Sequence, residues 1–180
     1  MPAELDRRRF ALAAAGVVVA AGSTTAMTIP EPDEPKRDYP APKFTPKFAK
    51  PLLDLTLIRD FVLFAHYDFD MVKKLYEKEP AILNATVDWG GGDFESALGG
   101  ASHLGKREIA EYLLDHGARM DIFCAAMLGL TDVIKGMIAA QPKLAQAKGP
   151  HGIPLIMHAK FGGKPAEGVF NYLTELSEKK

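Results

Sequence analysis

The chain repeats short stretches of its own sequence. Residues 70–73, Asp-Met-Val-Lys, return as Asp-Val-Ile-Lys at 132–135. A second motif, Ala-Ser-His-Leu-Gly at 101–105, returns as Ala-Ala-Met-Leu-Gly at 125–129. Internal repetition is typical of small units that cannot bury an apolar face alone and must stack on one another. The sequence therefore predicts a row of similar units within one folded domain.

Net charge and cysteine content exclude several kinds of partner and site. The formal net charge of -1 gives no electrostatic support for a nucleic-acid partner. Cys124 is the only cysteine, which rules out an intramolecular disulfide and a cysteine-based zinc site. A lone small thiol of this kind is expected in the core. We expect a monomer that needs no cofactor.

The first 26 residues have the pattern of an export signal. Three arginines at 7–9 precede an apolar run from Ala13 to Ala21, and small residues close the segment at Ala26. A basic start, a short apolar middle and a small-residue end are typical of a secretory signal. The paired arginines and Phe10 resemble a twin-arginine signal. This resemblance implies a periplasmic or exported protein that contacts the membrane only transiently; a merely hydrophobic N-terminal helix is the alternative.

Residues 27–54 are predicted to be a proline-rich linker. Seven of the 13 prolines lie between residues 27 and 51, interleaved with charged residues and without a helical or strand period. Proline removes backbone donors and holds the chain extended. A solvated spacer is therefore expected, and a proline-rich recognition strip is the alternative.

Helical periodicity begins after this linker. Apolar residues at Leu57, Phe61 and Phe64 recur at helical spacing and predict a first helix. A second helix is expected to end at Glu79-Pro80, because the residue before a proline avoids the helical region. Residues 82–84 are expected to leave it in an extended conformation. Further helices are predicted from Ser96 onward.

Residues 96–118 resemble the ankyrin repeat. Ser-Ala-Leu at 96–98 stands where that family has Thr-Pro-Leu, and Ala101-Ser102-x-x-Gly105 matches its Ala-Ala-x-x-Gly turn. Residues 108–118 match its second helix, Glu-Ile-Val-x-x-Leu-Leu-x-x-Gly-Ala. The resemblance covers residues 55–176, with 177–180 as a tail. It implies an all-α fold, an ankyrin-repeat-like α-solenoid of about four helix-turn-helix repeats, whose finger hairpins are expected to be short or missing.

The resemblance also implies a function in protein binding. Ankyrin stacks bind proteins through a concave groove and finger loops, so the chain is expected to be an exported binding module without catalysis. Its partner would be an unknown protein of the cell envelope. A solitary exposed tryptophan on a finger loop is a typical binding anchor, although a buried one would only clamp the loop. The contacts predicted on these surfaces are Trp89, Asp93, Glu95, His103, Met127 and Lys160.

Two histidines support a second hypothesis. By repeat register, His66 and His103 occupy the same position, two residues before a turn, so their rings are expected to be neighbours. Such a pair can hold a metal ion or transfer protons. The alternative is therefore a small periplasmic enzyme or a metal- or ligand-binding domain centred on His66, His103 and the Asp88–Glu95 loop. Whether His151 lies beside that loop depends on the alignment of two fingers, which the sequence leaves open. A structural part of an envelope complex is a third possibility.

Overall fold

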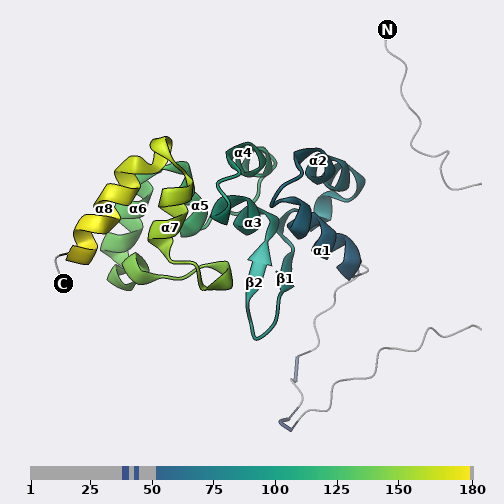
Figure 1. Ribbon diagram of the computed structural model, residues 1–180. Helices are drawn as coiled ribbons and strands as arrows, with labels where there is room; N and C mark the ends of the chain where they lie inside the picture. The colour runs from purple at the N-terminus through teal and green to yellow at the C-terminus, as the bar shows by residue number, and fades with distance from the viewer. Residues whose placement is uncertain (1–37, 41–42, 45–51, 179–180) are drawn as a thin grey trace, which may run out of the picture. The chain divides into compact units, whose positions relative to one another are not determined.

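The computed structural model describes residues 38–40, 43–44 and 52–178, so the predicted signal at 1–26 and most of the predicted linker lie outside them. This part of the chain is mostly helical, as predicted, with eight α-helices that follow one another in pairs (Figure 1). The pairs are α1 (Leu55–Phe64) with α2 (Phe69–Lys78), α3 (Ala97–His103) with α4 (Arg107–Asp115), α5 (Ile122–Leu128) with α6 (Thr131–Ala140), and α7 (Leu155–Phe161) with α8 (Glu167–Glu178).

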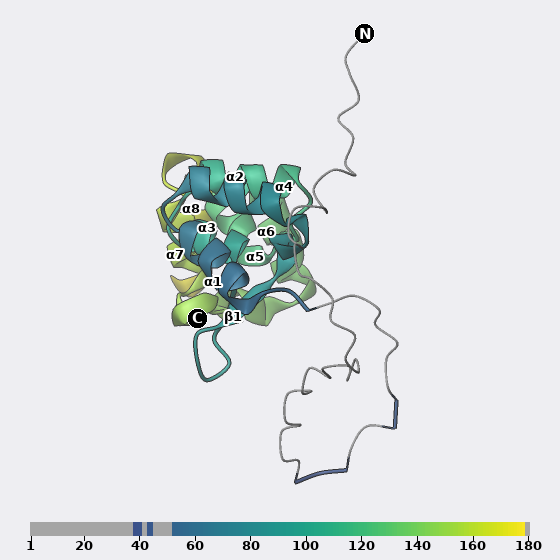
Figure 2. The same cartoon turned by 90° about the vertical axis from the view of Figure 1, so that its right-hand side faces the viewer.

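Short elements connect the pairs. A 3₁₀ turn η1 (Pro80–Asn84) and an antiparallel hairpin of β1 (Thr86–Asp88) and β2 (Phe94–Ser96) lie between the first and second pairs. Two further 3₁₀ turns, η2 (Pro142–Gln146) and η3 (Pro150–Gly152), join α6 to α7, and η4 (Lys164–Ala166) joins α7 to α8. The hairpin extends away from the helices (Figure 2).

The first helices of the four pairs pack against one another. Helix α1 contacts α3, α3 contacts α5, and α5 contacts α7, while α3 also touches α7 directly. Two apolar clusters result. One joins the first two pairs and takes in Cys124 and Met127 of α5; the other joins the last two pairs. Each pair therefore buries its apolar face against its neighbours.

Side-chain caps explain where several helices begin. Asp54, Asp68, Ser96 and Asp121 each precede a helix and accept hydrogen bonds from backbone N–H groups of its first turn. These N–H groups have no partner within the helix, so a capping oxygen stabilises the helix start. The predicted helix opening at Ser96 is confirmed by its bond from the Gly99 N–H, 3.1 Å long.

Three predictions about short segments can be compared with the structure. The extended exit at residues 82–84 is wrong: Pro80 starts a 3₁₀ turn there, and the Glu79 carboxylate accepts the Ala81 N–H. The tail predicted at 177–180 begins too early, because α8 continues to Glu178. Beside the expectation of short or missing finger hairpins, residues 52–178 contain a single hairpin with three-residue strands, and no strand lies between α4 and α5.

The lone cysteine is a core residue, as predicted. Cys124 is fully buried, and burial raises the pKa of its thiol to about 11. At pH 8 such a thiol is about 0.1% ionised, against about a quarter for an ordinary cysteine. We expect the native chain to resist a thiol reagent at pH 8 and to react rapidly once unfolded in guanidinium. Rapid labelling of the native chain would contradict the burial.

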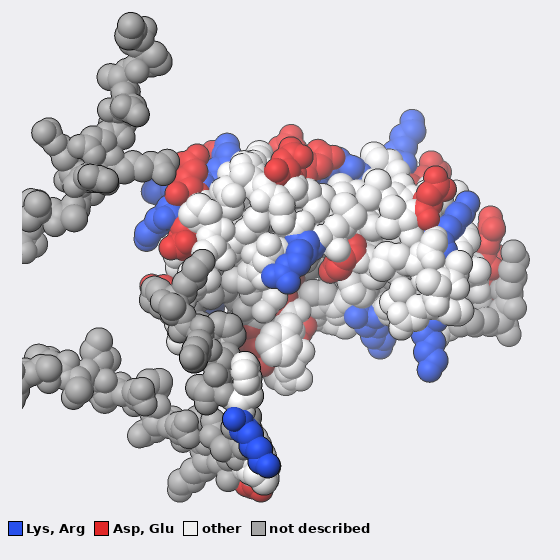
Figure 3. All heavy atoms as spheres, turned by 180° about the vertical axis from the view of Figure 1, so that it is seen from behind, with Lys and Arg blue, Asp and Glu red and all other residues white. Residues whose placement is uncertain are grey.

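None of the helices in the described residues is long and apolar enough to cross a membrane. On the face seen in Figure 3, basic and acidic side chains are interspersed, and neither sign forms a continuous patch. That face therefore lacks the basic stripe that typically attracts nucleic acid.

Candidate metal centre

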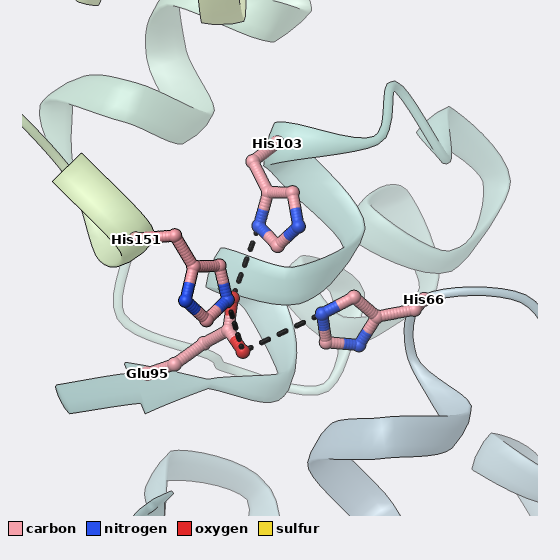
Figure 4. Close-up of side chains that lie close together, drawn as sticks. All are labelled: His66, Glu95, His103 and His151. Atoms are coloured by element: carbon pink, nitrogen blue, oxygen red, sulfur yellow. Dashed lines mark ion pairs between the residues drawn. The ribbon is translucent and has the colours of Figure 1, made fainter. Parts of the chain in front are cut away.

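Four titratable side chains converge where the first two pairs meet the connection before α7 (Figure 4). His66 follows α1, Glu95 lies on β2, His103 ends α3, and His151 lies on η3. One nitrogen or oxygen atom from each of the four lies within 4.8 Å of the others. Residues far apart in sequence thus form one compact group, which we call the His₃Glu cluster.

Glu95 is the centre of this cluster. Its Oε1 lies 3.0 Å from His103 Nδ1, and its Oε2 lies 3.4 Å from His66 Nε2 and 3.5 Å from His151 Nε2. Strand alternation explains its direction, because β2 turns Phe94 outward and Glu95 inward. The Glu95 side chain is completely buried, whereas His151 retains 38% of its side-chain surface exposed. The cluster is therefore open to solvent on the His151 side.

Two buried atoms of the cluster have no hydrogen-bond partner. Glu95 Oε1 and His103 Nδ1 face each other at 3.0 Å but are not aligned for a hydrogen bond, and neither has another partner among the described residues. A buried polar atom without a partner costs free energy, about 1–3 kcal/mol for a neutral group and more for a charged one. Such orphaned groups call for an explanation, and a cation held between them is one.

Outer contacts fix the orientation of two rings. His66 Nδ1 donates to the Val62 carbonyl oxygen at 2.8 Å, which leaves Nε2 facing Glu95. His151 Nδ1 donates to Asp93 Oδ2 at 2.8 Å, which leaves its Nε2 facing Glu95 as well. Histidines that bind metals nearly always donate their other ring N–H to a carbonyl or carboxylate in this way. The two rings thus have the outer contacts of metal ligands.

The hairpin positions the carboxylate. Trp89 Nε1–H donates to Glu95 Oε2 at 2.8 Å, so Oε1 alone remains unpaired. The loop that carries Trp89 is shaped by three glycines with positive φ, and Asp88 Oδ1 accepts the N–H groups of Gly90 and Gly92. Only glycine adopts such conformations freely. The glycine-rich stretch thus places Trp89 over Glu95.

The pKa shifts of Glu95, His66 and Asp93 follow from their contacts within the cluster. Burial alone would raise the pKa of Glu95, but the adjacent imidazoles of His103 and His66 and the Trp89 N–H outweigh it and hold that pKa well below its usual range. The hydrogen bond to Glu95 raises the pKa of His66, against the opposing effect of burial. The backbone N–H of His151 lowers the pKa of Asp93. The cluster therefore holds a carboxylate anion among imidazoles and stabilises positive charge beside it.

The donor atoms lie close enough together to converge on one metal ion. Ligands about 2.0–2.1 Å from a tetrahedral zinc ion lie about 3.3 Å from each other. The three separations, measured from the two oxygens of Glu95, run from 3.0 to 3.5 Å, and one donor atom from each of the four residues lies within 4.8 Å of the others. Imidazole nitrogens and a carboxylate oxygen suit Zn²⁺, Cu²⁺ and Ni²⁺ better than Ca²⁺ or Mg²⁺. The residues present therefore fit a divalent transition metal.

The predicted site residues fall into three groups. The His66 and His103 rings are neighbours, as expected from repeat register, with centroids 4.9 Å apart. Trp89 and Asp93 are half-buried and contact the cluster, and Lys160 is exposed on α7. Of the other predicted groove contacts, Glu95, His103 and Met127 are 1%, 5% and 0% exposed, so their side chains present almost no surface to a partner.

Packing between helices explains why Met127 is buried and why His151 joins the cluster. Helix α7 and η4 lie against α5, where Gly162 approaches the Met127 carbonyl and closes the surface that a groove would need. The sequence missed His151 as a member of the cluster. Its one signal was the Gly149–Gly152 turn, which reaches the cluster only because the two fingers align.

Comparisons of the chain with models of protein families, with characterised proteins and with solved structures find no match. No relative therefore supplies an activity, a ligand or a partner. The function is inferred from the His₃Glu cluster itself.

Proposed function

We propose that this chain is a metal-binding domain in which His66, Glu95, His103 and His151 hold one divalent transition-metal ion such as Zn²⁺. The observation that carries the proposal is the buried contact between Glu95 Oε1 and His103 Nδ1, which lie 3.0 Å apart and have no hydrogen bond. A cation bound by both atoms removes the cost of burying them unpaired. The two rings oriented by outer contacts complete the ligand set.

The donor set favours a structural or regulatory ion over a catalytic one. Four protein ligands fill a tetrahedral shell, whereas catalytic zinc sites keep one position for water or substrate. The site contains no thiolate, since Cys124 lies in the core outside the cluster. Imidazole and carboxylate ligands are not oxidised as thiols are. The site would therefore suit an oxidising periplasm, to which the predicted N-terminal export signal points.

We infer an ankyrin-type repeat arrangement for the helical part. Four helix pairs, packing between their first helices and one short hairpin support it. The direct contact between α3 and α7 departs from a simple row, in which each unit contacts only its neighbours. In this arrangement the cluster fastens successive repeats to one another.

A titration tests the metal site directly. Zn²⁺ is added to the chain, purified without a histidine tag, and binding is followed by calorimetry and by the fluorescence of Trp89, the only tryptophan. We expect one ion per chain with a Kd below about 1 µM, equivalent to about 8 kcal/mol. The absence of saturable binding at about 100 µM Zn²⁺, which corresponds to less than about 6 kcal/mol, would overturn the proposal.

The Trp89 hydrogen bond to Glu95 should tune the affinity. Trp89→Phe keeps an aromatic ring but removes the N–H donor, so Glu95 loses its outer contact. Loss of such a contact typically weakens metal binding by about 10- to 100-fold. We expect this loss by calorimetry, and no change for Tyr172→Phe on α8. Equal affinity of Trp89→Phe and the unsubstituted chain would refute a positioning role for Trp89.

Protein binding is a second candidate function. Tyr67, Leu104 and Phe161 are 66%, 46% and 44% exposed. Each directly follows the position that is equivalent in the aligned helix pairs, which is occupied by His66, His103 and Lys160. Exposed apolar side chains that recur along a repeat protein favour a partner surface. Passing extracts of the cell envelope over the immobilised chain tests for such a partner, and no specific capture would count against this candidate.

A further inference from the structure

His151 is the only ligand of the cluster that comes from outside the first two helix pairs. His66, Glu95 and His103 follow or belong to α1, β2 and α3, whereas His151 lies in the connection between α6 and α7. We call residues 147–154 of this connection the His151 loop. An ion bound by all four residues therefore ties the His151 loop to the hairpin and to α3.

Few other contacts hold this loop against the hairpin. The His151 backbone N–H donates to Asp93 Oδ1 at 2.9 Å, and its ring Nδ1 donates to Asp93 Oδ2 at 2.8 Å. The His151 ring packs edge-on against His103, with centroids 5.2 Å apart. Both hydrogen bonds end on one half-exposed aspartate, and the Trp89 ring also lies beside His151, so the contacts with the hairpin centre on His151, while Pro150 packs near Gly99 of α3.

The backbone at His151 is strained. Its φ of 59° is the only positive φ of a non-glycine residue among those that the structure describes. A histidine in this left-handed region is uncommon and persists where surrounding contacts enforce it. Releasing the ring from the cluster removes one of those contacts. The loop is therefore poised to relax when His151 is not held.

A pocket lies between the loop and the hairpin. Its volume is about 370 Å³, with Asp93 and Phe94 of the hairpin on one side and Lys148, Gly149 and Pro150 of the loop on the other. Because Asp93 and Pro150 flank the contact that His151 makes, the position of the loop decides the shape of this pocket. Movement of the loop would separate its two walls.

We propose that the metal ion acts as a latch: binding to His151 fastens the His151 loop onto the hairpin and assembles the pocket, and loss of the ion releases the loop. This inference rests on the proposed metal site and adds its regulation. The buried Glu95 and His103 and the half-buried His66 form the fixed part of the site, and the exposed fourth ligand, His151, is the part that moves. Metal supply thereby controls a surface cavity next to the ion.

Hydrogen exchange tests the latch on the intact chain. Exchange of the backbone amides at 147–154 is compared with one equivalent of Zn²⁺ and with excess chelator. We expect exchange to slow by about tenfold or more when Zn²⁺ is bound, because the loop opens less often. Amides of α8, remote from the cluster, should change much less.

A matched pair of variants isolates His151. His151→Asn removes the imidazole, while asparagine tolerates a positive φ; the control is His116→Asn, at an exposed histidine beyond α4. At Zn²⁺ concentrations that saturate the three remaining ligands, His151→Asn should show no metal-dependent protection of the loop. His116→Asn should behave as the unsubstituted chain does.

The outcomes separate the latch from the metal site. Bound Zn²⁺ without any slowing of exchange at 147–154 would overturn the latch and leave the metal site standing. Undiminished metal-dependent protection in His151→Asn would overturn the latch as well. Failure of the unsubstituted chain to bind Zn²⁺ in calorimetry would remove both proposals together.

Discussion

Glu95→Gln is expected to weaken Zn²⁺ binding by about 100-fold or more. Structural zinc sites in small domains gain about 10–16 kcal/mol from the ion, which is about 3 kcal/mol for each of four ligands. Glutamine keeps the size of the side chain but removes the negative charge that all three histidines face. The substitution should therefore weaken ion binding and leave the packing of the side chain unchanged.

Calorimetry and thermal melts with and without Zn²⁺ measure this effect. The unsubstituted chain should melt higher with Zn²⁺, because an ion that binds only the folded state stabilises it. In Glu95→Gln that metal-dependent increase should nearly vanish, while the helical circular dichroism is retained. The control is Glu175→Gln, at an exposed carboxylate of α8. An equal increase in Glu95→Gln and in the control would sink the metal site.

Repeat register predicted half of the cluster. His66 and His103 were placed at equivalent positions from the sequence, and their rings do lie side by side. Register works here because α1 and α3 pack directly against each other, so equivalent residues face the same way. Helix starts were equally readable where an N-cap such as Ser96 precedes an apolar run, since capping is a local effect.

The remainder depends on contacts that no local pattern encodes. His151 reaches Asp93 because α7 touches α3 as well as α5, which shifts the connection before α7 toward the hairpin. The same packing buries Met127, which register alone had placed in an open groove. A one-dimensional repeat predicts neighbours along the row, and it fails where a unit contacts the next but one.

The buried Glu95 carboxylate depends both on local strand geometry and on long-range packing. Strand alternation directs Glu95 inward, a local effect, but what it meets is set by three separate helix connections. A buried anion is stable only if it is paired, so the cluster and the packing require each other. A substitution that displaces the His66 ring and leaves Glu95 in place should therefore show how much metal binding depends on the packing around the cluster.

Gly100→Ala provides that separation and should weaken metal binding about as strongly as the loss of one ligand, about 100-fold. A Cβ atom at Gly100 would lie 2.6 Å from His66 Cε1 and 2.9 Å from His66 Nδ1, so the ring must move. Its Nδ1 is tied to the Val62 carbonyl, which leaves it little room to shift while Nε2 stays on the metal. The absence of a side chain at Gly100 thus leaves room for the His66 ring.

Gly99→Ala is the matched control in the same helix. Its added Cβ would lie 3.4 Å from Glu95 Cγ and 3.6 Å from Pro150 Cγ and Ser96 Oγ, which are ordinary contacts that require no side chain to move. Alanine is favoured over glycine in a helix by about 0.8–1.0 kcal/mol, so Gly99→Ala should be neutral or stabilising and should bind Zn²⁺ normally. Both variants share that gain in helix propensity, so any difference in affinity between them reports the His66 clash. Equal Zn²⁺ affinity of the two variants in calorimetry would show that His66 is not a ligand.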